Sequence, residues 1–172
     1  MTDNREETES PTVTVPVKKS RNVLLAVDGS KGCKKAFDWY LENMWRSSDL
    51  VLLVHVFNPP TLPSYSFSTP GTGLVVPAAY QQLVEEAQKQ AREIIDGYET
   101  VLKSSKVPYR TIVHSGDTGE TICAIAEVEN ADAIVVGCRG LGVIRRTFLG
   151  SVSDYVLHHV HIPVTVVPGK QK

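Results

Sequence analysis

The chain has 172 residues, a length that fits one domain with or without a tail. Its net charge of -1 argues against a dedicated nucleic-acid binder and gives no support to a polybasic membrane-surface protein. No apolar run approaches the ~20 residues that span a bilayer, and the polar first ten residues do not resemble a secretory signal, so we expect a cytoplasmic location. Three scattered cysteines, Cys33, Cys123 and Cys138, predict thiols rather than a disulfide framework or a zinc site.

The chain opens on a segment that does not favour folding. Residues 1–20 carry acids and prolines without helical apolar spacing, so we expect a disordered tail. Residues 22–28 then form a continuous apolar run that stops at Asp28, a pattern typical of a central parallel strand covered on both faces. Ser30 is placed to cap the helix that follows.

Alternating strand and helix patterns continue to the end of the chain. Residues 49–57 predict a second buried strand. Residues 58–77 are rich in proline and glycine, and their role stays open between a lid on the adenine side, a partner site and a simply mobile loop. An amphipathic helix is expected from about 79 to 103. The remaining elements are strands at 109–114, 131–137 and 162–167 and helices at about 118–128, begun by the capping pair Asp117 and Glu120, and 151–159.

This alternation predicts an α/β domain over residues 21–168, followed by a short tail at 169–172. Its fold class would be an open five-stranded parallel sheet with helices on both faces. A ligand site is then expected beyond the carboxyl ends of the strands, where the strand order reverses.

One stretch, residues 137–153, carries the pattern of an anion site. It runs from a strand end to a helix start, where unpaired N–H groups and the helix dipole favour phosphate. It contains several glycines and three arginines, and no acid occurs from Ala133 through Ser153. The residues alone leave a plainer alternative open, in which the glycines serve turns, Gly150–Ser151 is an ordinary cap and the arginines form a solvated face.

Neither of the two common phosphate-binding fingerprints is present. The pattern GxxxxGK[ST] does not occur, and Gly140 and Gly142 are not completed to GxGxxG because Arg145 stands at the last position.

The glycine spacing resembles that of a known family. Gly137-x2-Gly140-x9-Gly150-Ser151 is similar to the ATP-binding motif of the universal stress protein family. The end of the first strand, His55-Val56 in the second, and the segments 149–159 and 163–167 also match the family, so the resemblance covers about residues 20–168. It implies the strand order 3-2-1-4-5 and a Rossmann-like fold of the adenine nucleotide alpha hydrolase type.

The resemblance also implies a set of ligand contacts. Ala26, Val27 and the backbone of Val56 would flank adenine, and Asp28 would lie near adenine and ribose. The residues expected around the ribose and phosphates are Gly137, Gly140, Gly150, Ser151, Val152 and Ser153, with Arg139 at a variable position of the motif. ATP is the implied ligand, whether Mg²⁺ accompanies it stays open, and residues 162–167 are expected to pair two copies into a homodimer.

The functional hypothesis is an ATP-binding regulatory or sensor module in stress response. A slow ATPase on the same site and a dimeric scaffold without nucleotide are the alternatives. No arrangement for nucleophilic catalysis is evident in the sequence. His158, His159 and His161 are interpreted as surface or packing residues rather than a shared metal site, and His55 as a satisfied core histidine.

Overall fold

The computed structural model describes residues 20–59, 78–138 and 149–169. All but one residue of each expected tail lies outside the described residues, which leave out 1–19 and 170–172. Residues 60–77 of the proline-rich stretch and residues 139–148 of the glycine-rich stretch also lie outside them.

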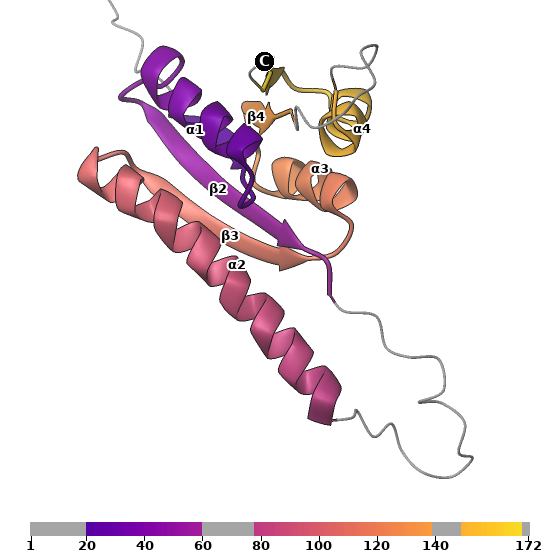
Figure 1. The fold of residues 1–172 in the computed structure, drawn as a ribbon. Helices are drawn as coiled ribbons and strands as arrows, with labels where there is room; N and C mark the ends of the chain where they lie inside the picture. The colour runs from indigo at the N-terminus through magenta and orange to yellow at the C-terminus, as the bar shows by residue number, and fades with distance from the viewer. Residues whose placement is uncertain (1–19, 60–77, 139–148, 170–172) are drawn as a thin grey trace, which may run out of the picture.

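Five parallel strands form a single sheet (Figure 1). They are β1 (Arg21–Ala26), β2 (Asp49–Phe57), β3 (Tyr109–Ser115), β4 (Ala133–Gly137) and β5 (Val164–Val167). Their order is β3-β2-β1-β4-β5, so the strand order predicted from the sequence is confirmed. The order reverses between β1 and β4, which pair directly with Ala26 opposite Val136.

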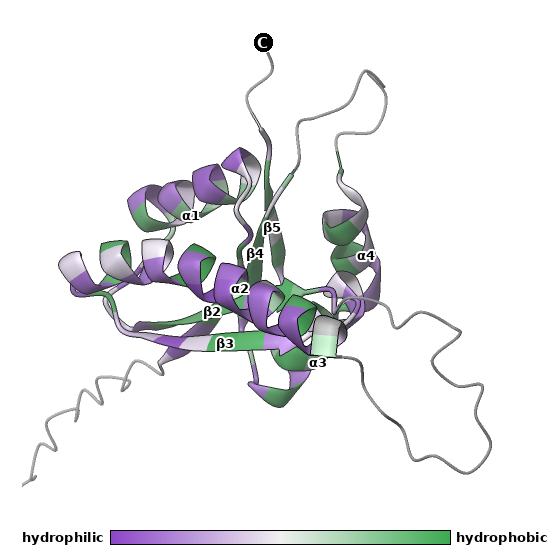
Figure 2. Ribbon diagram, turned by 60° about the horizontal axis from the view of Figure 1, so that its bottom comes forward, coloured by the Kyte–Doolittle hydropathy of each residue, from purple (hydrophilic) through white to green (hydrophobic). Residues whose placement is uncertain are grey.

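In the part of the chain that the structure describes, four helices cover the two faces of this sheet. They are α1 (Lys31–Asn43), α2 (Ala78–Ser104), α3 (Thr118–Val128) and α4 (Ser151–His159). Alternate residues of the inner strands point to opposite faces: Val23, Leu25, Val51 and Leu53 join the core beneath α1 and α2, whereas Leu24, Leu52 and Val54 join the core beneath α3 and α4. In Figure 2 the helices carry hydrophobic residues toward the sheet and hydrophilic residues outward.

Three predicted strand boundaries were too wide. β1 ends at Ala26 rather than at residue 28, although the Val27 amide still donates to Val54 O at 2.9 Å. β4 begins at Ala133, because the backbone amide of Asn22 donates to the side-chain carboxylate of Asp132, at 2.8 Å, instead of to a strand carbonyl. β5 begins at Val164, one residue after Pro163, which has no N–H to give a ladder.

Polar side chains fix the amino end of the sheet. The Arg21 guanidinium bonds both carboxylate oxygens of the buried Asp49, at 3.0 and 2.6 Å, and the Tyr40 hydroxyl donates to the same carboxylate at 2.9 Å. Burial alone would raise the pKa of Asp49, but the hydrogen bonds from Arg21 and Tyr40 outweigh it and hold the pKa below its usual value. This cluster lies at the opposite end of the strands from their carboxyl termini.

Two predicted helix starts are confirmed at atomic detail. Ser30 caps α1 by accepting the Cys33 amide at 3.2 Å, and Asp117 caps α3 by accepting the Glu120 amide at 3.1 Å. None of the helices in the described part of the chain is long and apolar enough to cross a membrane.

Candidate nucleotide site

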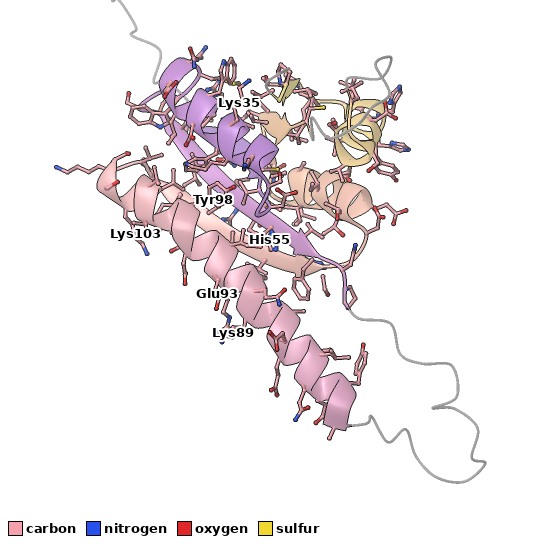
Figure 3. All side chains as sticks on the ribbon, in the orientation of Figure 1. Lys35, His55, Lys89, Glu93, Tyr98 and Lys103 are labelled. Carbon is pink, nitrogen blue, oxygen red and sulfur yellow. The ribbon has the colours of Figure 1, made fainter. Side chains whose placement is uncertain are left out.

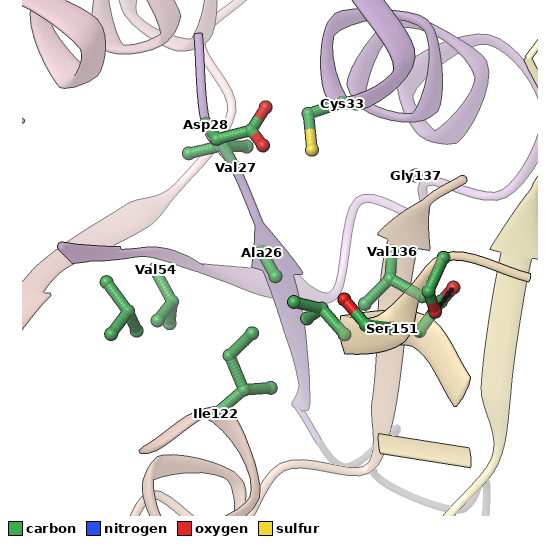
Figure 4. Close-up of a pocket in the computed structure, with 13 residues that line it drawn as sticks. Ala26, Val27, Asp28, Cys33, Val54, Ile122, Val136, Gly137 and Ser151 are labelled. Atoms are coloured by element: carbon green, nitrogen blue, oxygen red, sulfur yellow. Dashed lines mark hydrogen bonds between the residues drawn. The ribbon is translucent and has the colours of Figure 1, made fainter. Parts of the chain in front are cut away.

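The strand reversal creates a pocket at the carboxyl ends of β1 and β4 (Figure 4). In open parallel sheets this reversal point leaves a crevice, because the chain leaves the two neighbouring strands toward opposite faces. Here α1 follows β1 on one face and α4 precedes β5 on the other. The pocket therefore forms where the sequence predicted a ligand site.

Nine of the residues predicted for the site line this pocket: Ala26, Val27, Asp28, Val56, Gly137, Gly150, Ser151, Val152 and Ser153. Arg139 and Gly140 lie outside the described residues. Four further lining residues were not predicted: Cys33, Val54, Ile122 and Val136. Strand alternation could have indicated Val54, which points to the same face as Val56, whereas Ile122 enters from α3 and has no local signal.

The turn between β1 and α1 forms one wall. The Asp28 carboxylate accepts the Ser30 amide at 2.7 Å, which fixes one of its two oxygens within the turn. Figure 4 shows the Asp28 carboxylate and the Cys33 thiol facing one another. Burial, together with hydrogen bonding to Asp28, raises the pKa of the Cys33 thiol to about 11, so this thiol stays protonated near neutral pH.

Two buried side chains that do not line the pocket form hydrogen bonds with the backbone of the same turn. His55 on β2 lies with Nδ1 2.8 Å from Val27 O, and the Tyr98 hydroxyl of α2 donates to Asp28 O at 2.8 Å. His55 is 5% exposed, and the prediction of a satisfied core histidine is therefore confirmed.

Gly137 brings β4 close to the first turn of α1. A Cβ added at Gly137 would lie 2.6 Å from Gly32 O and 2.8 Å from the Cys33 backbone nitrogen. Glycine at this position is thus required by the approach of two backbones, whatever else it does for a ligand.

The opposite wall is the start of α4, where Gly150 occupies the N-cap position without a side-chain cap. The first amide that bonds within this helix is that of Asp154, which donates to Gly150 O at 2.9 Å. The amides of Ser151, Val152 and Ser153 therefore stand at the N-terminal turn, where a helix attracts anions. The Ser153 hydroxyl also donates to Gly150 O, at 2.9 Å, so its single proton is already used inside the helix.

The two histidines of α4 make local contacts within the helix. His158 and His159 each direct Nδ1 at the backbone carbonyl four residues earlier, and the His159 ring stacks on Tyr155 with centroids 3.8 Å apart. No group of three or more potential metal ligands occurs among the described residues. The three cysteines are all described and form no disulfide.

Comparison with known proteins agrees with this fold. Residues 19–168 match the sequence profile of the universal stress protein family. A putative universal stress protein of Staphylococcus aureus is 30% identical to the chain, over 86% of this chain and 83% of the relative. The chain therefore belongs to the universal stress protein family.

Two solved structures have a similar architecture. Universal stress protein UspA from Lactobacillus plantarum superimposes with a TM-score of 0.69 at 20% identity, covering 87% of this chain and 98% of that one. A universal stress protein family member from Arabidopsis thaliana, solved with AMP bound, gives a TM-score of 0.61 at 22% identity, covering 86% of this chain and 90% of that one.

Proposed function

We propose that this chain binds ATP in the pocket between β1 and β4 and acts as a nucleotide-dependent regulatory or sensor module in stress response. The observation that carries the proposal is the meeting of the β1 end, the β4 end and the α4 N-terminus around one pocket. One side of this pocket is apolar and the other is polar, which matches the base and the phosphates of a nucleotide.

The apolar side suits a base. Val54, Val56 and Ile122 line the pocket together with Ala26 and Val27, and such a surface stabilises a flat aromatic ring by excluding water. We assign adenine to this side and the ribose to the neighbourhood of Asp28. The AMP found in the Arabidopsis protein supports an adenine nucleotide as the ligand class.

The polar side suits phosphate. The N-terminal turn of α4 offers backbone amides and the positive end of a helix dipole. We assign the phosphates to Gly137, Gly150, Ser151, Val152 and Ser153. Gly140 and Arg139 are also assigned to the phosphate motif, and this assignment rests on the sequence alone.

Among the described lining residues, Asp28 is the one carboxylate. A Mg²⁺ ion bound with the nucleotide would therefore be held mainly by phosphate oxygens and water, which is a common arrangement for this ion. We assign Asp28 to ligand binding rather than to activation of a water molecule, and we expect at most slow hydrolysis.

The quaternary proposal concerns the edge of the sheet. β5 is an edge strand, and exposed strand edges favour pairing with another chain. We propose that two copies pair through residues 162–167 into a homodimer in the cytoplasm.

The first experiment identifies the nucleotide. Freshly purified protein is denatured, any released nucleotide is identified, and ATP, AMP and GTP are titrated by calorimetry with and without Mg²⁺. The double variant Gly140→Glu, Gly150→Glu places two carboxylates in the proposed phosphate motif and is expected to abolish binding. Gly97→Glu is the control, because it adds the same side chain on α2 where an added Cβ meets nothing within 4 Å.

The proposal is supported if the parent protein and Gly97→Glu bind ATP and the double variant does not. No binding at millimolar ATP would refute it and favour the scaffold alternative. Rapid turnover that disappears in Asp28→Ala would instead favour the ATPase alternative.

A further inference from the structure

Two side chains outside the pocket hold consecutive carbonyl groups of its β1–α1 turn. The His55 ring bonds Val27 O and the Tyr98 hydroxyl donates to Asp28 O, each at 2.8 Å. A carbonyl oxygen only accepts hydrogen bonds, so Nδ1 of His55 carries the proton in this contact. Val27 and Asp28 both line the pocket, whereas His55 and Tyr98 are not among its described lining residues.

These two contacts provide hydrogen bonds that neither the strand ladder nor the helix gives to the two carbonyl groups. β1 ends at Ala26 and α1 begins at Lys31, so the carbonyls of Val27 and Asp28 lie between the strand ladder and the helix. Buried carbonyl groups require partners, and a turn without them would sample several conformations. Side chains from β2 and α2 thus restrict the segment that faces the ligand.

Tyr98 is itself held firmly. Its ring packs edge-on against Phe37 of α1, with centroids 4.9 Å apart, and burial raises the pKa of its hydroxyl, which therefore remains a donor. Figure 3 shows Tyr98 directed from α2 toward the sheet, while Lys89 and Glu93 point away from it. One buried residue of α2 thus connects that helix to the pocket wall.

We propose that Tyr98 and His55 are positioning residues of the nucleotide site, which set its affinity by holding the Val27–Asp28 backbone in the binding conformation. The proposal rests on nucleotide binding at this pocket as proposed above. It makes α2 part of the binding apparatus although the described residues of that helix do not line the pocket. Because binding linkage is reciprocal, nucleotide must in turn restrain the turn and the α2 segment around Tyr98.

The test compares two buried tyrosines that each lose one hydroxyl. Tyr98→Phe keeps the ring against Phe37 and removes the bond to Asp28 O. Tyr40→Phe also removes a buried hydroxyl bond, to Asp49, but at the amino end of the sheet. Both variants are expected to melt at a somewhat lower temperature, whereas only Tyr98→Phe should bind ATP more weakly, by about three- to tenfold.

A second pair of variants tests His55 in the same titration. His55→Leu removes the donor and is expected to weaken binding, while His55→Asn places an amide N–H near the position of Nδ1 and should restore most of the affinity. Amide hydrogen exchange over residues 26–31 provides a readout without ligand: the turn should exchange faster in Tyr98→Phe than in Tyr40→Phe.

The outcomes separate the two proposals. A parent protein that binds no nucleotide overturns the proposed function, and the positioning role falls with it. A parent that binds ATP, with Tyr98→Phe and Tyr40→Phe indistinguishable from it in affinity and in exchange of the turn, overturns the positioning role alone.

Discussion

A methyl group at position 137 would lie 2.6 Å from the Gly32 carbonyl oxygen, closer than non-bonded carbon and oxygen atoms approach. The atoms that it would meet belong to the backbone of Gly32 and Cys33 in the first turn of α1, so they cannot rotate away as a side chain could. The tight contact brings Asp28, Cys33 and Gly137 around one pocket.

Gly137→Ala is therefore expected to destabilise the protein by about 1–3 kcal/mol, the usual cost of forcing extra volume into a packed site. Gly97→Ala is the matched control: it lies on the exposed side of α2 with nothing within 4 Å of an added Cβ, and should stabilise by about 1 kcal/mol. Urea denaturation measures both. Equal stability of the two variants would show that β4 and α1 can separate without cost.

Cys33 should react slowly for a thiol that lines a pocket. Its pKa of about 11 leaves roughly one molecule in a thousand as thiolate at pH 8, and the thiolate is the reactive form. We expect iodoacetamide to label Cys33 much more slowly in the native than in the unfolded protein, with a rate that rises between about pH 9 and pH 11. Mass spectrometry of the tryptic peptide reports the rate, and ATP should lower it further.

Fast native labelling at neutral pH would contradict the arrangement of Cys33 beside Asp28. The sequence singled out Asp28 because a buried strand stops there, but it offered no reason to choose Cys33. A cysteine in an amphipathic helix is typical of an ordinary core residue, and no local pattern indicates that its thiol lies beside Asp28.

At the scale of single elements, α4 shows how a short helix divides its polar groups between its own structure and a ligand. The hydroxyl of Ser153 is 2.9 Å from Gly150 O and the residue is 1% exposed, whereas Ser151 is exposed at the pocket rim. The two serines, which the sequence treated alike, should thus behave differently.

Ser153→Ala is expected to leave ATP affinity within about twofold, because the hydroxyl proton already belongs to the helix and the amide is retained. Ser151→Ala should weaken binding by more, since Ser151 is exposed in the pocket and its hydroxyl donates to no acceptor among the described residues. Calorimetric titration of both variants checks this. A larger loss in Ser153→Ala would mean that its hydroxyl rotates to the ligand on binding.

Elements were predictable where the pattern is local. The buried runs at 49–57 and the capping residues Ser30 and Asp117 indicated strands and helix starts correctly. The start of β4 was misplaced because Asp132 bonds Asn22, a partner 110 positions away that no local window contains. Likewise, the carbonyls of Val27 and Asp28, which follow β1, are held by His55, which the sequence assigned only to the core, and by Tyr98 of α2.

For the whole molecule, the sheet leaves β3 and β5 as its two edges. The sequence predicted the order of the strands through a family resemblance, and alternation alone would have allowed other orders. It also predicted pairing of two copies through residues 162–167.

Val164→Lys adds a charge to the β5 edge and should convert the proposed dimer to monomer, because a lysine on an edge strand opposes pairing. Val113→Lys is the control on the β3 edge, where the residue is 41% exposed. Sedimentation velocity measures the mass of each. A parent that sediments as a monomer, or a dimer that persists in Val164→Lys and dissociates in Val113→Lys, would contradict pairing through β5.

The pocket also has a mechanical consequence. Its two sides come from distant parts of the chain, since β1 and β4 pair there with Ala26 opposite Val136, 110 positions further along (136 − 26). A ligand that touches both sides would act as a reversible cross-link between the beginning and the end of the chain. Partial opening that separates β4, α4 and β5 from β1 would first require the ligand to dissociate. Bound nucleotide would therefore protect the carboxyl-terminal part of the chain from proteolysis, to an extent that rises with the occupancy of the pocket.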